Sequence, residues 1–353
     1  MSRIPALDSL RGIAVLLVLL SHASICNMNI LPGLDLSYTG KYGVYLFFVL
    51  SAYLLDKQII VAVFERKDKF FQSYLVKRFM RIYPLYIISL IIMYIINSVT
   101  SGYRAIEIVD FNDIIKHIFL LESKSIYWSI PVEFLYYLVS PFLVLIIKLI
   151  YSLTKNHSFV FLFLGTLISC SILGWYVDKE NIFRIILFTK PVKYFTLFIP
   201  GLTIAYIHYF NQKEGLFTIN YKINKILLIP CIILLAISIR LIWTKWLDLP
   251  FIWHDMRLAI VFGCIWSIIL SFTLFKSCKN PNFLRSTPLM LVGKVSYSAY
   301  LLHIPILYFY RDITEINPHI KLLLFLATTT AISYLSYRLL ENQFSKITKK
   351  ILK

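Results

Sequence analysis

The first apolar stretch of the chain, Leu10-Arg-Gly-Ile-Ala-Val-Leu-Leu-Val-Leu-Leu-Ser-His22, carries two ionisable side chains inside a segment hydrophobic enough to enter a membrane. Burying an arginine at the centre of a membrane helix costs roughly 2.5–3.5 kcal/mol, so a segment that keeps Arg11 and His22 is expected to use them. Helical steps of about 100° bring both side chains onto one stripe, about 16 Å apart along the axis. We expect one end of this stripe near a membrane surface and the other deep in the bilayer.

The composition around this segment is that of a membrane protein. Of the 353 residues, 59% are hydrophobic and 15% are charged, whereas a soluble domain is about 45–50% apolar and about 25% charged. The formal net charge is +18. A basic chain first suggests a nucleic-acid partner, but the positive-inside rule for membrane loops explains the charge better, and we expect no nucleic-acid binding. The five cysteines are scattered without metal-binding spacing, so we expect no metal site and no disulfide.

Apolar windows of membrane length predict an all-α, polytopic integral membrane helix bundle of about ten transmembrane helices. The windows cover residues 10–26, 42–62, 82–98, 128–150, 157–177, 191–210, 225–243, 253–275, 289–310 and 319–340. Asp56-Lys57 interrupts the second window, and the amphipathic stretch 108–122 is too polar to span. Most lysines and arginines fall in alternate loops that begin with the N-terminus, which places both termini in the cytoplasm. We expect one domain over residues 1–353 and no appended soluble domain.

Further ionisable residues stand at the ends of other windows. Arg78 and Arg81 lie three residues apart at the cytoplasmic entry of the third window, so they share a helix face. By helix rise, His22 lies about 20 Å from the inner surface and Glu133 about 9 Å from the outer one, the same level in a core about 30 Å thick. The sequence therefore predicts a cationic mouth on the inner side and a pair of His22 and Glu133 deep in the membrane.

Each of these groups also has a simpler interpretation. Arg78 and Arg81 could serve only as positive-inside anchors of topology. His22 could donate to a helix carbonyl and do nothing else, and Glu133 could pair with a lysine or arginine to hold the bundle together. His303, near the midplane of the ninth window, could equally be structural. The agreement of the depths favours a shared site over four separate explanations.

Six motifs follow one another along the chain. They are Ile4-Pro-Ala-Leu-Asp8-Ser-Leu-Arg11 with His22 eleven residues later, Gly43-Val-Tyr-Leu-Phe47-Phe48-Val-Leu-Ser51, Arg78-Phe-Met-Arg81-Ile-Tyr-Pro84, Trp128-Ser129-Ile-Pro-Val-Glu133, Lys294-Val-Ser296-Tyr297-Ser-Ala-Tyr300-Leu-Leu-His303 and Leu340-Glu341. In this order and spacing the chain resembles the membrane acyltransferase type 3 family, which includes bacterial O-antigen and peptidoglycan O-acetylases. The resemblance runs from residue 4 to about residue 345.

The resemblance implies a multi-pass O-acyltransferase of the bacterial inner membrane. It would move an acyl group, expected to be acetyl, from cytoplasmic acyl-CoA to a hydroxyl of a cell-surface or lipid-linked sugar such as O-antigen. Acetyl-CoA is then a donor substrate, and no resident cofactor is expected. Because CoA phosphates need cations, Arg11, Arg78 and Arg81 are assigned to the donor. His22 is expected to act as the general base with Glu133 as the acid that orients it, or else Glu133 binds the sugar.

The acceptor is expected to meet a second set of residues at the outer mouth: Tyr127, Trp128, Ser129 and His303. The aromatic pair suits stacking on a sugar face, although simple interfacial anchoring is the alternative. The sequence lacks Gly-x-Ser-x-Gly, so we favour direct transfer, with an acyl-histidine intermediate left open. Two rival functions remain: an acyltransferase for a non-sugar hydroxyl, and a transporter or flippase, because buried His, Glu and Arg also serve proton-coupled transport.

Overall fold

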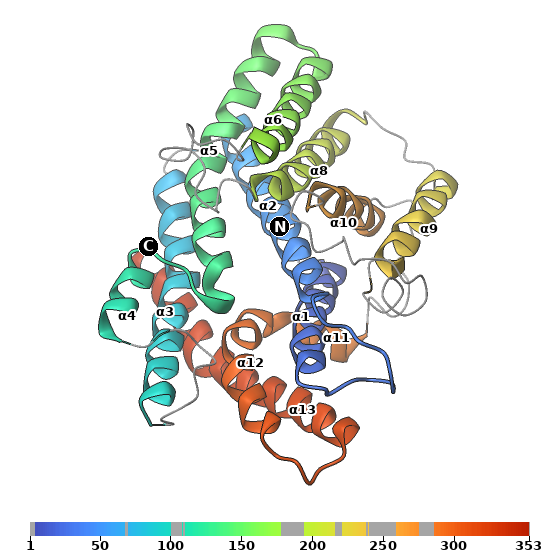
Figure 1. The fold of residues 1–353 in the computed structure, drawn as a ribbon. Helices are drawn as coiled ribbons and strands as arrows, with labels where there is room; N and C mark the ends of the chain where they lie inside the picture. The colour runs from blue at the N-terminus through green and yellow to red at the C-terminus, as the bar shows by residue number, and fades with distance from the viewer. Residues whose placement is uncertain are drawn as a thin grey trace.

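The computed structural model describes residues 4–67, 70–99, 108, 110–177, 194–215, 221–237, 239, 259–274 and 286–352. Within these ranges every element is helical, which confirms the expected all-α class (Figure 1). The elements are α1 (Pro5–Ile25), α2 (Gly40–Phe64), α3 (Phe70–Val99), α4 (Phe111–Ile118), the 3₁₀-helix η1 (Ser125–Trp128), α5 (Ser129–Thr154), α6 (His157–Val177), α8 (Phe195–Glu214), α9 (Tyr221–Ile237), α10 (Ala259–Leu274), α11 (Thr287–Lys294), α12 (Ser296–Arg311), α13 (Pro318–Ser336), a π-helical turn (Tyr337–Glu341) and α14 (Asn342–Ile351).

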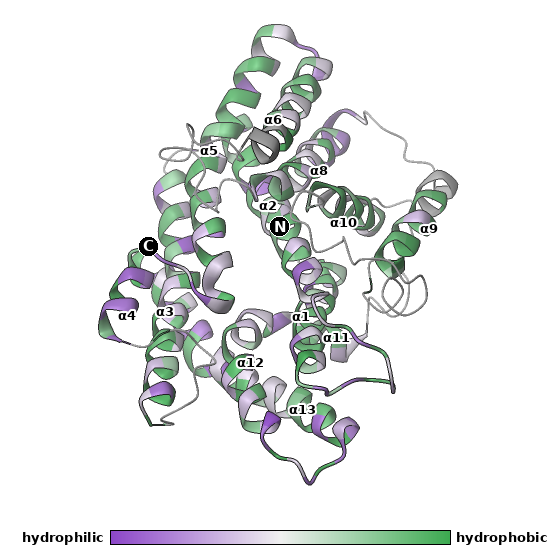
Figure 2. Cartoon of the chain, in the orientation of Figure 1, coloured by the Kyte–Doolittle hydropathy of each residue, from purple (hydrophilic) through white to green (hydrophobic). Residues whose placement is uncertain are grey.

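Five helical segments of the described chain are long and apolar enough to cross a membrane, so the chain is a multi-pass membrane protein. They are Pro5–Ile25, Gly40–Phe64, Phe70–Val99, Ser125–Thr154 and Pro318–Ile351. Shorter apolar helices lie within α6, α9 and α10, and hydrophobic residues predominate along α5 and α10 (Figure 2). The expected count of ten is not confirmed. Parts of the sixth, seventh and eighth windows, residues 191–193, 238, 240–243, 253–258 and 275, lie outside the described residues.

The sequence predicted one helix over the ninth window, residues 289–310, and the structure shows that this prediction is wrong. The window divides at Val295 into α11 and α12, which are bent by 78° relative to each other. A hydropathy window cannot detect such a bend, because composition is the same on both sides of it. The bend accompanies close packing of α11 on α1: a Cβ on Gly293 would lie 1.7 Å from the Asp8 carbonyl oxygen. Only glycine permits that approach, and it lets both α11 and α12 pack beside α1.

The second window is also different from expectation, because α2 continues without a break through Asp56. The Asp56 carboxylate is fully buried and accepts hydrogen bonds from the Tyr136 hydroxyl, at 2.6 Å, and from Ser140 Oγ. A buried carboxylate is tolerated when its oxygens are hydrogen-bonded in this way. With this residue satisfied, α2 forms the centre of the bundle, in contact with α1, α5, α8 and α10 (Figure 1).

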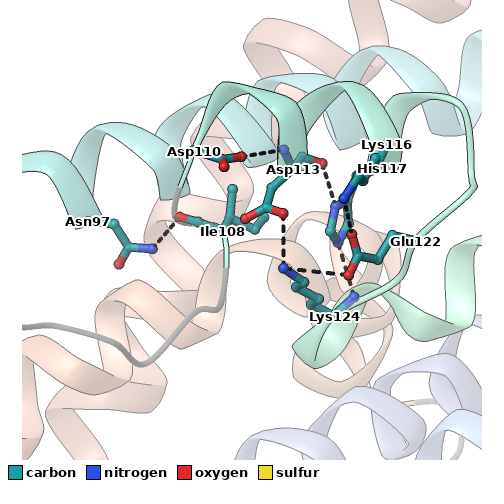
Figure 3. A network of polar contacts seen from close by, with 8 residues as sticks. All are labelled: Asn97, Ile108, Asp110, Asp113, Lys116, His117, Glu122 and Lys124. Atoms are coloured by element: carbon teal, nitrogen blue, oxygen red, sulfur yellow. Dashed lines mark hydrogen bonds and ion pairs between the residues drawn. The ribbon is translucent and has the colours of Figure 1, made fainter.

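The amphipathic stretch between α3 and α5 contains the short helix α4 and a polar network (Figure 3). Asp110 caps α4 by accepting from the Asp113 backbone N–H at 2.7 Å. His117 Nδ1 donates to the Asp113 carbonyl at 2.7 Å, and its Nε2 accepts from the Lys124 backbone N–H at 3.0 Å. Lys124 Nζ also lies 2.9 Å from Asp113 Oδ1. These bonds hold the chain where it enters η1, which carries Trp128 to the site.

Candidate active site

Three cavities adjoin one another inside the bundle. The basic cavity, about 470 Å³ in volume, is lined by the cationic side chains of Arg11, Lys77, Arg78, Arg81, Lys294 and Lys349. The central cavity, about 70 Å³, has apolar side chains in its wall and is also lined by the polar residues Arg11, Ser51, Arg81, Ser129, Glu133, Tyr137, Ser296, Tyr297 and Tyr300. The histidine cavity, about 260 Å³, has apolar side chains in its wall and is also lined by Ser21, His22, Tyr38, Lys41, Ser125, Trp128 and Tyr300.

Shared wall residues show that the three cavities are neighbours in a row, which we call the path. Arg11 and Arg81 line both the basic and the central cavity. Val44 and Tyr300 line both the central and the histidine cavity. The path therefore leads from a cluster of cations at one end, across the middle of the bundle, to His22 at the other.

The arginines of the basic cavity come from α1 and α3 and are held by neighbouring groups. The Arg78 guanidinium lies 5.8 Å from the ring centroid of Tyr74 and 5.6 Å from that of Tyr137. Such cation–π contacts fix a guanidinium without neutralising it. Arg11 is 3.9 Å from Asp8, at the outer limit for an ion pair. The cavity therefore keeps an excess of positive charge.

Glu133 projects from α5 into the wall of the central cavity. Its Oε1 accepts hydrogen bonds from Ser51 Oγ and from the Tyr137 hydroxyl, each at 2.6 Å. Ser51 comes from α2, whereas Tyr137 lies one turn further along α5. Within the described chain Oε2 makes no further hydrogen bond, so it remains free to accept one from a group that enters the cavity.

His22 meets His303 of α12 instead of Glu133. No hydrogen bond joins His22 to Glu133 in the part of the chain that the structure describes, so the predicted direct pair is wrong. The reason is helix packing: α1 packs on α2, α11 and α12, and it presents His22 to a different cavity from the one that Glu133 lines. His22 Nδ1 lies 2.9 Å from the Val18 carbonyl oxygen and 3.3 Å from His303 Nε2.

These contacts determine which ring nitrogens carry protons. A carbonyl oxygen only accepts, so Nδ1 of His22 is the donor to Val18. In the same way His303 Nδ1, 2.7 Å from the Tyr300 carbonyl oxygen, carries a proton, and His303 Nε2 is left as an acceptor toward His22. His22 Nε2 is then unprotonated, as a general base requires.

The expected acceptor residues divide into two groups. Trp128 lines the histidine cavity, and Ser129 lines the central cavity and donates to the Tyr300 hydroxyl at 3.0 Å. Tyr127 is fully buried against the rings of Tyr86 and His117. The prediction that Tyr127 stacks on a sugar is therefore wrong. His303 is also fully buried, and its contact is with His22 rather than with a cavity.

Sequence reasoning missed several wall residues. Ser51 and Tyr300 stood in quoted motifs without a role, and Tyr137 is the helical neighbour four residues after Glu133, a spacing that could have drawn attention to it. No comparable signal pointed to Lys349, because a lysine in a polar helix is usually a solvated side chain.

Comparison with known proteins identifies the family of the chain. The family model acyltransferase 3, described as an acyltransferase domain, matches residues 4–338. The chain belongs to the acyltransferase 3 family. It is 25% identical over 369 residues to the peptidoglycan O-acetyltransferase OatA of Listeria monocytogenes, which covers 97% of this chain and 56% of that protein.

Two other similar proteins come from different organisms. The protein that carries the name acetyltransferase ORF330 of Acidianus two-tailed virus is 26% identical over 309 residues, 85% of this chain and 82% of its own length. An O-acetyltransferase by name from Staphylococcus aureus strain COL is 24% identical over 376 residues, 98% of this chain and 58% of its own length. The chain thus spans little more than half of the Listeria and Staphylococcus proteins. No solved structure matches it.

Proposed function

We propose that this acyltransferase 3 protein moves an acetyl group from cytoplasmic acetyl-CoA to a hydroxyl of a cell-surface or lipid-linked glycan. One observation carries the proposal: the cations that suit CoA phosphates and the unprotonated nitrogen of His22 lie at opposite ends of one path through the bundle. The family and the names of its relatives support O-acetylation. O-antigen is the acceptor that we favour, and peptidoglycan, named for the Listeria relative, belongs to the same chemical class.

The path suits the parts of the donor in order. Arg11, Arg78 and Arg81 supply bidentate donors for phosphate in a cavity of about 470 Å³. The central cavity, about 70 Å³, is much smaller than the basic cavity on one side and the histidine cavity of about 260 Å³ on the other, so it is the narrow part of the path. That size favours the thin pantetheine arm and a small acyl group over a long one. Arg11 and His22 are about 16 Å apart along α1, a distance suited to this arm.

The chemical step is a direct transfer. As the acceptor oxygen forms its bond to the thioester carbonyl carbon, His22 Nε2 takes the hydroxyl proton. The bond from carbon to sulfur then breaks, and the thiolate leaves with that proton as CoA thiol. His303 Nε2 accepts from His22 Nδ1–H and stabilises the imidazolium, the task that an acid performs in a triad. His303 is thus a positioning residue, and Glu133 serves the central cavity, where its Oε2 can accept from an amide of the arm.

At the outer end, Trp128 offers a ring for the acceptor. It lies in the wall of the histidine cavity and is supported by the rings of Phe48, at 5.9 Å, and Tyr194, at 4.7 Å between centroids. An aromatic face beside the base suits stacking on a sugar. We therefore assign the histidine cavity to the acceptor and the other two cavities to the donor.

The test measures the release of CoA thiol from acetyl-CoA by the purified protein, with and without a lipid-linked oligosaccharide or a peptidoglycan fragment as acceptor. We expect acceptor-dependent release, an ester on the sugar by mass spectrometry, and loss of both with His22→Ala. His319→Ala is the matched control, because His319 also donates from Nδ1 to a carbonyl, that of Asn29, but away from the cavities. Full activity of His22→Ala would remove the base. An ester on a non-sugar hydroxyl, or transport of glycan without thiol release, would establish a rival function.

A further inference from the structure

The basic cavity extends past the arginines of α1 and α3 to a second helix, α14. Asn342, Ser345 and Lys349 of α14 line it at intervals of three and four residues, which places them on one helix face. Lys77, one residue before Arg78 on α3, lines the same cavity. α14 packs against α3 at this point, and the path from the arginines to His22 does not involve it.

The charges of this cavity are unequal. Six cationic side chains face two carboxylates, Asp8 and Glu341. Asp8 is already near Arg11, and Glu341 accepts a hydrogen bond from Ser298 Oγ. Across the described ranges, neither Lys77 nor Lys349 forms an ion pair. A partly enclosed cavity with uncompensated positive charge attracts an anion.

A π-helical turn, Tyr337–Glu341, connects α13 to α14 and holds α14 in place. Glu341 bonds to Ser298 of α12, and Lys294 Nζ of α11 lies 4.9 Å from the Tyr337 ring centroid. These two contacts tie the turn to the same helices that carry His303 and the bend at Val295. π turns are rare and concentrate at functional sites. This one fixes where α14, the helix that carries Lys349, begins.

We propose that Lys349 and Lys77 bind the ribose 3′-phosphate of the CoA donor, and that α14 thereby selects CoA over its 3′-dephospho form. The inference rests on the proposed donor. Arg11 and Arg81 line both the basic and the central cavity, so they meet the diphosphate that is joined directly to the pantetheine arm. Four cations line only the basic cavity, and two of them, Arg78 and Lys294, lie against tyrosine rings. Among the described residues Lys77 and Lys349 have no such ring contact, which leaves them for the phosphate on the far side of the nucleotide. The cavity volume of about 470 Å³ is within the usual range of about 300–1,000 Å³ for ligand sites.

The experiment compares acetyl-CoA with acetyl-3′-dephospho-CoA as donors for the purified full chain, and compares CoA with 3′-dephospho-CoA in direct binding. For the unchanged protein we expect the KM and Kd ratios between the two forms to be at least about tenfold, since each charge-assisted contact contributes about that factor. Lys349→Ala should lower both ratios and leave the KM of the dephospho donor unchanged, and the double variant with Lys77→Ala should bring both ratios close to one. Lys77→Ala should act in the same direction.

Lys350→Ala is the matched control, because Lys350 is the next residue on α14 but does not line the cavity, and its ratios should stay those of the unchanged protein. Equal use of both donors by the unchanged protein would overturn the inference and leave the proposed function standing. So would a Lys349→Ala variant that weakens both donors equally. If the unchanged protein neither binds nor turns over acetyl-CoA, the proposed function fails, and the inference fails with it.

Discussion

Replacing His303 tests the proposed mechanism most directly, because this residue lies behind the base and is fully buried. His303→Leu removes the more distant of the two acceptors of His22 Nδ1–H, at 3.3 Å, and leaves the Val18 carbonyl at 2.9 Å. A hydrogen bond to a charged group contributes about 1.5–3 kcal/mol, and this one gains its strength only when His22 becomes an imidazolium. Because the Val18 carbonyl still accepts from the same N–H, we expect the lower end of this range, a fall in kcat of about tenfold. The KM for acetyl-CoA should stay unchanged, because His303 does not contact the basic cavity.

The assay is acceptor-dependent thiol release at saturating donor, with the amount of folded protein measured by size-exclusion chromatography. His303→Gln supplies a side-chain carbonyl that can accept from His22 Nδ1–H, so it should recover part of kcat. His319→Leu, which removes a comparable histidine outside the site, should leave kcat intact. Full kcat in His303→Leu, or equal losses in the leucine and glutamine variants with correctly folded protein, would refute a role for His303 as the acceptor behind the base.

The remaining predictions concern packing, pH and the donor. Gly293→Val should lower the thermal midpoint by several degrees in a thermal-shift assay, since its Cβ would overlap the Asp8 carbonyl, whereas Gly165→Ala, with open space around it, should not. Burial lowers the pKa of His117 below 6.5. The folded protein should therefore have its full stability above pH 6.5 and lose stability as acid protonates the ring. His117→Asn should flatten this pH dependence when thermal midpoints are measured between about pH 7.5 and about pH 5. Butyryl-CoA should be a poorer donor than acetyl-CoA in thiol release, because the central cavity is narrow; equal rates would contradict the volume argument.

The bent pair α11 and α12 has a mechanistic consequence. Because α11 lies along α1 at Gly293, the bend at Val295 brings Lys294 to the basic cavity and starts α12 beside the same helix. α12 then carries His303 to His22, which lies on α1. One crossing between two backbones thus positions a cation at one end of the path and the partner of the base at the other.

The sequence by itself determined the features that depend on neighbouring residues. Hydropathy established an all-helical membrane protein, and helix periodicity placed Arg11 and His22 on one stripe and Arg78 beside Arg81. Both pairs do line the cavities. These conclusions hold because rise and rotation per residue are the same in every α-helix, so spacing along the chain converts directly into spacing along an axis.

Only the tertiary structure decided which helix faces meet. His22 contacts His303, which is 281 residues away in the sequence, and Glu133 accepts from Ser51, which is 82 residues away. His22 and Glu133 do not pair with each other. The same is true of the burial of Tyr127 and of the bend at Val295. Depth estimates give the position along each axis but not the neighbour across it. The neighbour depends on where small residues such as Gly293 let two backbones approach, and that is a property of both helices together.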